Sequence, residues 1–147
     1  MIRLVTLCLG AVLLPGQVFA QERLSLACPL EHASGREPKE PFSWDPPDMK
    51  IIMMSQSDTL VRSAYEGRVS NISKTEDGFY ELVIYHAIYY FWYYNVTRPL
   101  VARGQAVRSG QHIGVYTPGS ELEFRVFRNE TLLDPRGWLQ CRIARAN

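Results

Sequence analysis

Several features are scarce in this 147-residue chain, and each shortage narrows its function. Histidine occurs three times, no run of basic residues is present, and the formal net charge is +1. A balance this close to neutral argues against nucleic acid and against an anionic membrane surface as partners. Lone histidines lack the partners that a catalytic site needs, so His86 and His112 are expected to be structural. Helical periodicity is missing too, because no window of helical length carries a convincing apolar stripe.

No apolar run is long enough to span a membrane. The longest lies at 4–14, which is short of the ~20 residues that a bilayer requires. It follows Arg3 and precedes Val18-Phe19-Ala20, a pattern typical of a secretory signal peptide that is cleaved before Gln21. An uncleaved anchor is the alternative, and the break at Pro15-Gly16 argues against it. We therefore expect an exported protein, periplasmic or secreted in a bacterial envelope, with no transmembrane anchor after cleavage.

The mature chain has the length of one domain. Removing a signal peptide at 1–20 leaves 147 − 20 = 127 residues. Repeated prolines predict an extended, proline-rich N-terminal arm at 21–47, because proline interrupts helices. We expect a β domain at 48–140 and a short C-terminal tail at 141–147.

Short apolar runs separated by turn residues predict an all-β domain. In the clearest run, apolar residues at 122, 124 and 126 alternate with charged residues at 121, 123 and 125. The expected strands are 50–54, 59–62, 67–73, 80–86, 90–95, 106–107, 112–117 and 121–128.

Six aromatic residues follow one another at 89–94. In a strand they divide between two faces, so Tyr90, Trp92 and Tyr94 point away from their neighbours in sequence. We expect one face to pack in the core and the other, with these three side chains, to form a candidate binding surface. A strand buried on both faces is the alternative, because such strands also read as continuous apolar runs.

Three motifs in the second half of the chain occur together in one known family. They are the G-Q-x-V-x-x-G-Q-x-I-G run at 104–114, the strand E-L-E-F-R-V at 121–126 and the closing D-P-x-x-W-L at 134–139. In this combination the chain resembles the LytM-like M23 zinc endopeptidases, which cut peptide cross-links in bacterial cell walls. The resemblance extends upstream to D-T-L-V-R-S-A-Y-E-G-R-V at 58–69. It implies a compact antiparallel β-sandwich of the duplicated hybrid motif, or LytM type.

The same resemblance indicates that the metal chemistry is lost. In the family this strand reads H-L-H-F-E-V. Both of its histidine positions hold glutamate in this chain, Glu121 and Glu123. The upstream histidine and aspartate ligand positions fall on Asp48 and Ile52, and the middle histidine falls on Asn95. Zinc needs imidazole, thiolate or carboxylate ligands plus an open position for water, and isoleucine has no lone pair to offer. No catalytic residue and no zinc cofactor are therefore expected.

Two classes of function remain open from the sequence. One is a catalytically inactive envelope protein that binds peptidoglycan, a cell-wall hydrolase or another envelope protein and modulates wall remodelling. The other is an M23-type metalloendopeptidase with an atypical carboxylate metal site at Asp48, Glu121 and Glu123. Fold alone does not decide between them.

Cleavage of the signal peptide removes Cys8 and leaves two cysteines, which flank the recognised segment. In an exported chain they predict one disulfide between Cys28 and Cys141. Two unpaired thiols are the alternative, and an oxidising compartment disfavours them.

Overall fold

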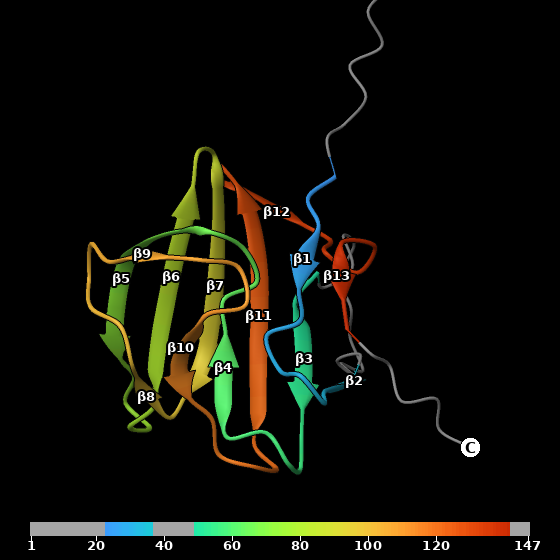
Figure 1. Ribbon diagram of the computed structural model, residues 1–147, viewed down its shortest axis with the longest axis vertical. Helices are drawn as coiled ribbons and strands as arrows, with labels where there is room; N and C mark the ends of the chain where they lie inside the picture. The colour runs from blue at the N-terminus through green and yellow to red at the C-terminus, as the bar shows by residue number, and fades with distance from the viewer. Residues whose placement is uncertain (1–22, 37–48, 142–147) are drawn as a thin grey trace, which may run out of the picture.

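The computed structural model describes residues 23–36 and 49–141, and every regular element among them is a β-strand (Figure 1). Residues 1–22, which include the predicted signal peptide, 37–48 and 142–147 lie outside the described part of the chain. Within the described part, no helix is long and apolar enough to cross a membrane. The all-β expectation is confirmed. The strands are β1 (Leu26–Ala27), β2 (Ser34–Arg36), β3 (Ile51–Met54), β4 (Leu60–Arg62), β5 (Gly67–Lys74), β6 (Tyr80–His86), β7 (Tyr89–Val96), β8 (Arg98–Pro99), β9 (Ala106–Val107), β10 (His112–Val115), β11 (Glu121–Arg128), β12 (Thr131–Leu133) and β13 (Leu139–Gln140).

Most strands form two antiparallel sheets, and β1 and β13 form a separate parallel pair. The large sheet has the order β2-β3-β11-β7-β6-β5-β9, with β12 paired to β11, and the small sheet has the order β4-β10-β8. Figure 1 shows the small sheet lying across the large one. Val61 and Ile113 of the small sheet and Phe91 and Phe124 of the large sheet are fully buried in one core cluster. The arrangement is the β-sandwich that the sequence predicts.

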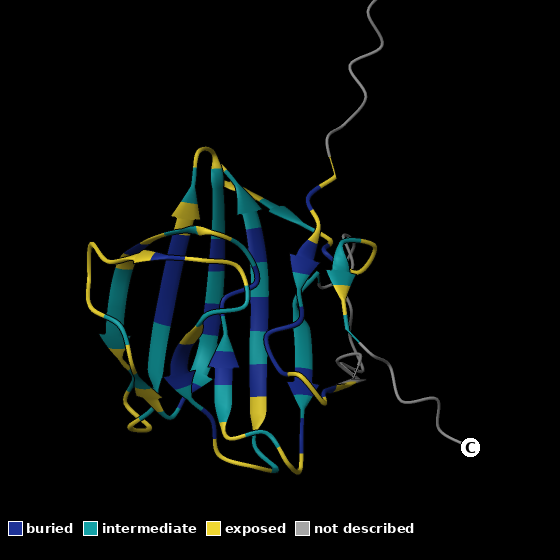
Figure 2. Ribbon diagram, viewed as in Figure 1, coloured by how far each residue is buried: buried dark blue, intermediate teal, exposed yellow. Residues whose placement is uncertain are grey.

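The alternation of side chains along β11 determines which face of this strand is buried. Leu122, Phe124 and Val126 are fully buried, while the residues between them stay partly exposed (Figure 2). The apolar face therefore packs against the small sheet and the charged face points the other way. Burying three such side chains stabilises the fold by roughly 1.5–3 kcal/mol each.

Two buried tyrosines join the sheets to loops. The Tyr93 hydroxyl accepts a hydrogen bond from the Ala64 amide at 2.8 Å, and the Tyr116 hydroxyl accepts one from the Ser55 amide at 2.9 Å. Burial raises the pKa of Tyr93, and hydrogen bonding to the Ala64 amide opposes that shift only in part. The Tyr93 phenol remains neutral at physiological pH, and both hydroxyls satisfy polar groups that the core would otherwise leave unpaired.

One glycine of the Gly-Gln motif is required by close packing. A Cβ atom on Gly114 would collide with the Cγ1 atom of Val96 and would lie 3.2 Å from the Arg98 carbonyl oxygen. Gly114 pairs with Pro99 of β8 on one side and Val61 of β4 on the other. The motif therefore keeps the small sheet close to the end of β7.

The N-terminal segment takes part in the core. Leu26 and Leu30 are fully buried, and β1 pairs in parallel with β13 from the other end of the domain. Strand β2 then extends the large sheet beyond β3. The predicted disulfide is confirmed: Cys28 and Cys141 are bonded, with Cα atoms 4.8 Å apart.

Loss of this disulfide is expected to lower the free energy of unfolding. The bond closes a loop of 113 residues, for which the chain-entropy model allows up to ~4.7 kcal/mol. Urea denaturation of the oxidised protein with and without a reducing agent measures the effect. A variant carrying both Cys28→Ala and Cys141→Ala serves as control, because its unfolding midpoint should not respond to the reductant. An unchanged midpoint in the wild-type protein, with both thiols shown to be free, would contradict the expectation.

Candidate functional site

The outer face of the large sheet, which points away from the small sheet, carries most of the positions that the sequence singled out. Glu123 on β11 lies opposite Ile52 of β3 on one side and Tyr94 of β7 on the other. Glu121 precedes Glu123 by two residues on the same face and lies opposite Met54. The structure therefore brings Ile52, Glu121 and Glu123 together, as the resemblance implies. Asp48 lies outside the described residues.

Asn95 adjoins this group at a β-bulge. The register pairs Tyr80 with Val96 and Leu82 with Tyr93, so Glu81 faces both Tyr94 and Asn95. Asn95 has a φ of 65°, in the left-handed region that asparagine tolerates better than most residues. The bulge places Asn95 beside Tyr94 at the end of the outer face.

A guanidinium group lies beside Glu123. The Arg125 Nε atom donates a hydrogen bond to the Glu123 Oε1 atom at 2.6 Å, and the same guanidinium lies 5.2 Å from the centre of the Tyr94 ring. Its charge also acts on Glu81, whose pKa is raised by burial against the opposing effect of Arg125. Sequence reasoning placed Arg125 on this face but gave it no role. The repeat of charges at 121, 123 and 125 was the signal for the ion pair.

The electrostatics around Tyr94 follow from these neighbours. Burial raises the pKa of the phenol, the charges of Glu81 and Glu123 raise it further, and Arg125 lowers it. Tyr94 therefore stays protonated and cannot serve as a base near neutral pH. With Arg125 already balancing Glu123, a second cation at this carboxylate would meet a like charge.

The aromatic strand β7 divides as the alternation predicts. Phe91 and Tyr93 are fully buried, whereas Tyr90, Trp92 and Tyr94 are half-buried on the outer face. The alternative of a strand buried on both faces is therefore wrong. The Trp92 ring stacks on the Tyr94 ring, with their centroids 5.8 Å apart and their planes at 20°. The centroid of the Phe127 ring of β11 lies 5.7 Å from that of Trp92. Beside these rings is a hollow of about 500 Å³, lined by Tyr90, Trp92, Phe127, Asn129 and Glu130.

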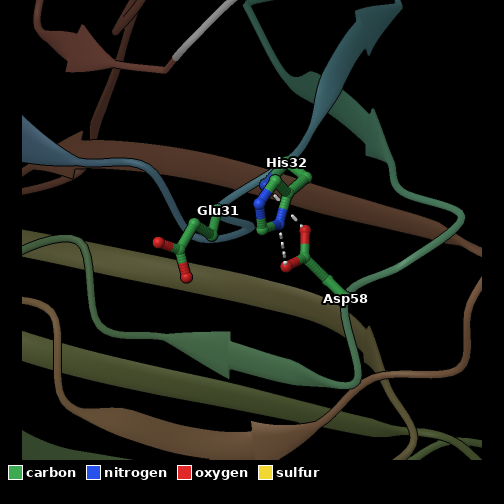
Figure 3. Close-up of side chains that lie close together, drawn as sticks. All are labelled: Glu31, His32 and Asp58. Carbon is green, nitrogen blue, oxygen red and sulfur yellow. Dashed lines mark hydrogen bonds and ion pairs between the residues drawn. The ribbon is translucent and has the colours of Figure 1, made fainter.

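A second group of polar side chains joins the N-terminal segment to the loop before β4 (Figure 3). The His32 amide donates to Asp58 Oδ2 at 2.8 Å, and the His32 Nδ1 atom lies 3.1 Å from Asp58 Oδ1. Glu31 completes a set of potential metal ligands whose donor atoms lie within 4.8 Å of one another. Both Asp58 oxygens already bind His32, however, and Glu31 pairs with Arg62 at 3.9 Å. These contacts join the N-terminal segment to the loop before β4, and we call the group the His32–Asp58 clasp. Sequence reasoning missed it, because residues 26 positions apart leave no local pattern.

Hydrogen bonding sets the ionisation of Asp58. Its partial burial tends to raise the pKa, but hydrogen bonds from the His32 amide, Ser55 and the His32 ring, together with the charge of His32, lower it overall. A carboxylate whose pKa is lower in the folded state contributes to the free energy of unfolding. This contribution is complete above the unfolded pKa of about 3.9 and is lost as pH falls through the folded pKa.

The sequence matches no protein-family model and no curated protein. The fold matches several solved structures, among them Helicobacter pylori Csd3, with a TM-score of 0.68 and 20% identity over 85% of this chain and 37% of that chain. A chain of the SpoIIQ–SpoIIIAH pore-forming complex matches with a TM-score of 0.64 and 14% identity, over 80% of this chain and 92% of that one.

A third match is to a mutant catalytic domain of the prophage-encoded M23 protein EnpA from Enterococcus faecalis. Its TM-score is 0.56 at 17% identity, over 70% of this chain and 88% of that one. These likenesses show that the chain has an M23-type fold, as its motifs predict. The chain spans little more than a third of the length of Csd3.

Replacing Asp58 with alanine is expected to destabilise the protein at pH 7 more than at pH 3. At neutral pH the substitution removes an ionised partner of His32, whereas at pH 3 part of that contribution is already lost in the wild type. Urea midpoints of both proteins at the two pH values measure the difference. Asp77→Ala, in the exposed turn between β5 and β6, is the matched control. If the urea midpoints of the wild type and Asp58→Ala differ by the same amount at both pH values, the role assigned to the clasp is contradicted.

Proposed function

Starting from an M23-type fold, we propose that this chain is a catalytically inactive relative of the LytM-like endopeptidases. It acts in the bacterial envelope by binding peptidoglycan, a cell-wall hydrolase or another envelope protein, and it thereby modulates wall remodelling. The observation that carries the proposal is the Glu123–Arg125 ion pair, which lies where the family's zinc ligands would be, next to Ile52.

Chemistry at these positions supports the loss of catalysis. A catalytic zinc requires about three nitrogen, sulfur or oxygen ligands at ~2.0–2.3 Å and a site for water. Ile52 supplies no ligand atom, and Glu123 already has a cationic partner at 2.6 Å. The positions that would handle the proton and the oxyanion hold Asn95 and Glu121. Asparagine does not titrate, and a carboxylate repels the negative charge that develops on an attacked carbonyl.

The half-buried aromatic rings of the outer face can instead form a binding surface. Tyr90, Trp92 and Tyr94 are half-buried side chains in a row, and tyrosine and tryptophan are enriched where proteins bind one another. Their edges and faces also suit the mixed polar and apolar surface of a wall fragment. The SpoIIQ–SpoIIIAH pore-forming complex supports the protein partner as an alternative to the wall, because one of its chains shares this fold.

Two observations favour an exported location. The first is the signal-peptide pattern of residues 1–20. The second is the Cys28–Cys141 disulfide, since such bonds persist in oxidising compartments such as the periplasm. The bond supports export without depending on the first twenty residues.

The mature protein is expected to bind zinc well below one ion per chain. The physical reason is the ligand set, in which an isoleucine and an ion-paired glutamate stand at ligand positions. Elemental analysis of protein purified without chelators measures it. About one zinc per chain, lost in Glu123→Ala and kept in the exposed control Glu76→Ala, would favour the carboxylate-based metallopeptidase and overturn the proposal.

Replacing Trp92 with alanine is expected to weaken binding to isolated cell walls, or to the envelope partner, by roughly 2 kcal/mol or more, the range of an aromatic hot spot. A sedimentation assay with purified walls measures the loss, and circular dichroism checks that the variant stays folded. Leu100→Ala is the control, since Leu100 is 42% exposed and follows β8 of the small sheet. Glu121→Gln and Glu123→Gln should change binding by no more than a few-fold. Cleavage of wall cross-links that either glutamine variant abolishes would refute the binding role.

A further inference from the structure

We infer that the hollow beside Trp92 binds the alkylammonium group of a wall peptide, held between three aromatic rings and the carboxylate of Glu130. The inference rests on the proposed function and deepens it, because it names the chemical group that is recognised on the wall. It concerns the end of the outer face away from Glu121 and Glu123, at the hairpin that joins β11 to β12.

The three rings of the hollow come from two neighbouring strands. Tyr90 of β7 lies directly opposite Phe127 of β11 in the register, and Trp92 lies two residues from Tyr90 on the same face. The planes of Trp92 and Phe127 meet at 57° with their centroids 5.7 Å apart, so the two rings form an open wedge. Each ring carries a negative electrostatic face, and a cation within ~6 Å of such faces is attracted to them.

The hairpin turn supplies the charge of the hollow. Asn129 adopts a φ of 52°, and its amide donates a hydrogen bond to the Ile88 carbonyl at 2.7 Å. This bond fixes the turn against the neighbouring β6–β7 turn and holds the exposed Glu130 at the rim. Among the described residues Glu130 has no ion-pair partner, so its carboxylate is available to a ligand.

The composition of the lining selects a cation. Three ring faces and one carboxylate make the hollow negative, and no lysine, arginine or histidine lines it. Arg125 lies opposite Trp92 in the register, but its guanidinium is bound to Glu123 and Tyr94. An anion would meet the Glu130 carboxylate, and a purely apolar group would leave the carboxylate without a partner. A hollow of about 500 Å³ has room for the end of an alkylamine side chain.

Continuity along the outer face points to a peptide as the carrier of the amine. Trp92 stacks on Tyr94, and Tyr94 lies opposite Glu123. A peptide that follows this row of side chains from Glu123 towards Trp92 would reach the hollow, where a side chain that carries a free amine could enter. The rings and Glu130 would then fix its position.

The test uses the mature, disulfide-bonded protein and two probes that share one alkyl stem, of which only one ends in a charged group. Nα-acetyl-lysine amide carries the ammonium group, and its Nε-acetylated derivative has the same stem without the charge. The charged probe is expected to shift the NMR resonances of the aromatic rings more than the neutral probe does. Glu130→Gln is expected to weaken its binding by about threefold or more, since it removes the carboxylate and leaves the rings. Glu76→Gln, in the exposed β5–β6 turn, should bind as the wild type does. Equal binding of both probes, or ring shifts caused by a neutral N-acetylglucosamine oligomer and not by the amine, would overturn the inference.

A second arm identifies the source of the amine. Walls whose free amines have been acetylated should bind the wild-type protein at least about threefold more weakly than untreated walls, and Glu130→Gln should show a smaller difference between the two preparations, because only the rings remain. Equal binding of both preparations, with binding still lost in Trp92→Ala, would refute the amine and leave the proposed function standing. Binding of the lysine probe without any binding to walls would refute both the wall as source and the wall-binding form of the proposed function.

Discussion

The pairing of β11 with its neighbours on both sides is the constraint on which the rest of the molecule depends. This strand joins β3 and β7 within the large sheet and carries β12 as well. Because its side chains alternate strictly, one half of it builds the core and the other half builds the candidate site. A shift of one residue in the register would bury Glu121, Glu123 and Arg125 and expose Phe124. The same eight residues therefore contribute both to the core and to the candidate site.

Charged side chains within the candidate site balance one another. A zinc site would balance carboxylates with a bound ion, whereas here the guanidinium of Arg125 balances Glu123 and lies over the Tyr94 ring. Arginine suits this task because its planar donors match a carboxylate and its face stacks on aromatic rings. This ion pair lies next to the row of half-buried aromatic side chains on the outer face.

The long strands could be predicted from the sequence because their pattern repeats. The expected β5, β6, β7 and β11 agree with the observed bounds to within a residue at either end. Strands β1, β8 and β13 were missed, since a strand of two residues is too short to show a period; β10, the partner of β8, was expected. The motifs single out Ile52, Glu121 and Glu123, and the structure places these three residues on neighbouring strands β3 and β11. The Glu123–Arg125 bond, the His32–Asp58 clasp and the role of Glu130 depend on side-chain geometry, which motifs do not encode.

The disulfide and the parallel β1–β13 pair lie side by side and join the two ends of the described domain. A pulling force applied between the chain before Cys28 and the chain after Cys141 passes through this covalent bond. The two sheets are thereby bypassed and carry none of the load. A chain held at both ends under tension would therefore keep the outer face of its large sheet undistorted.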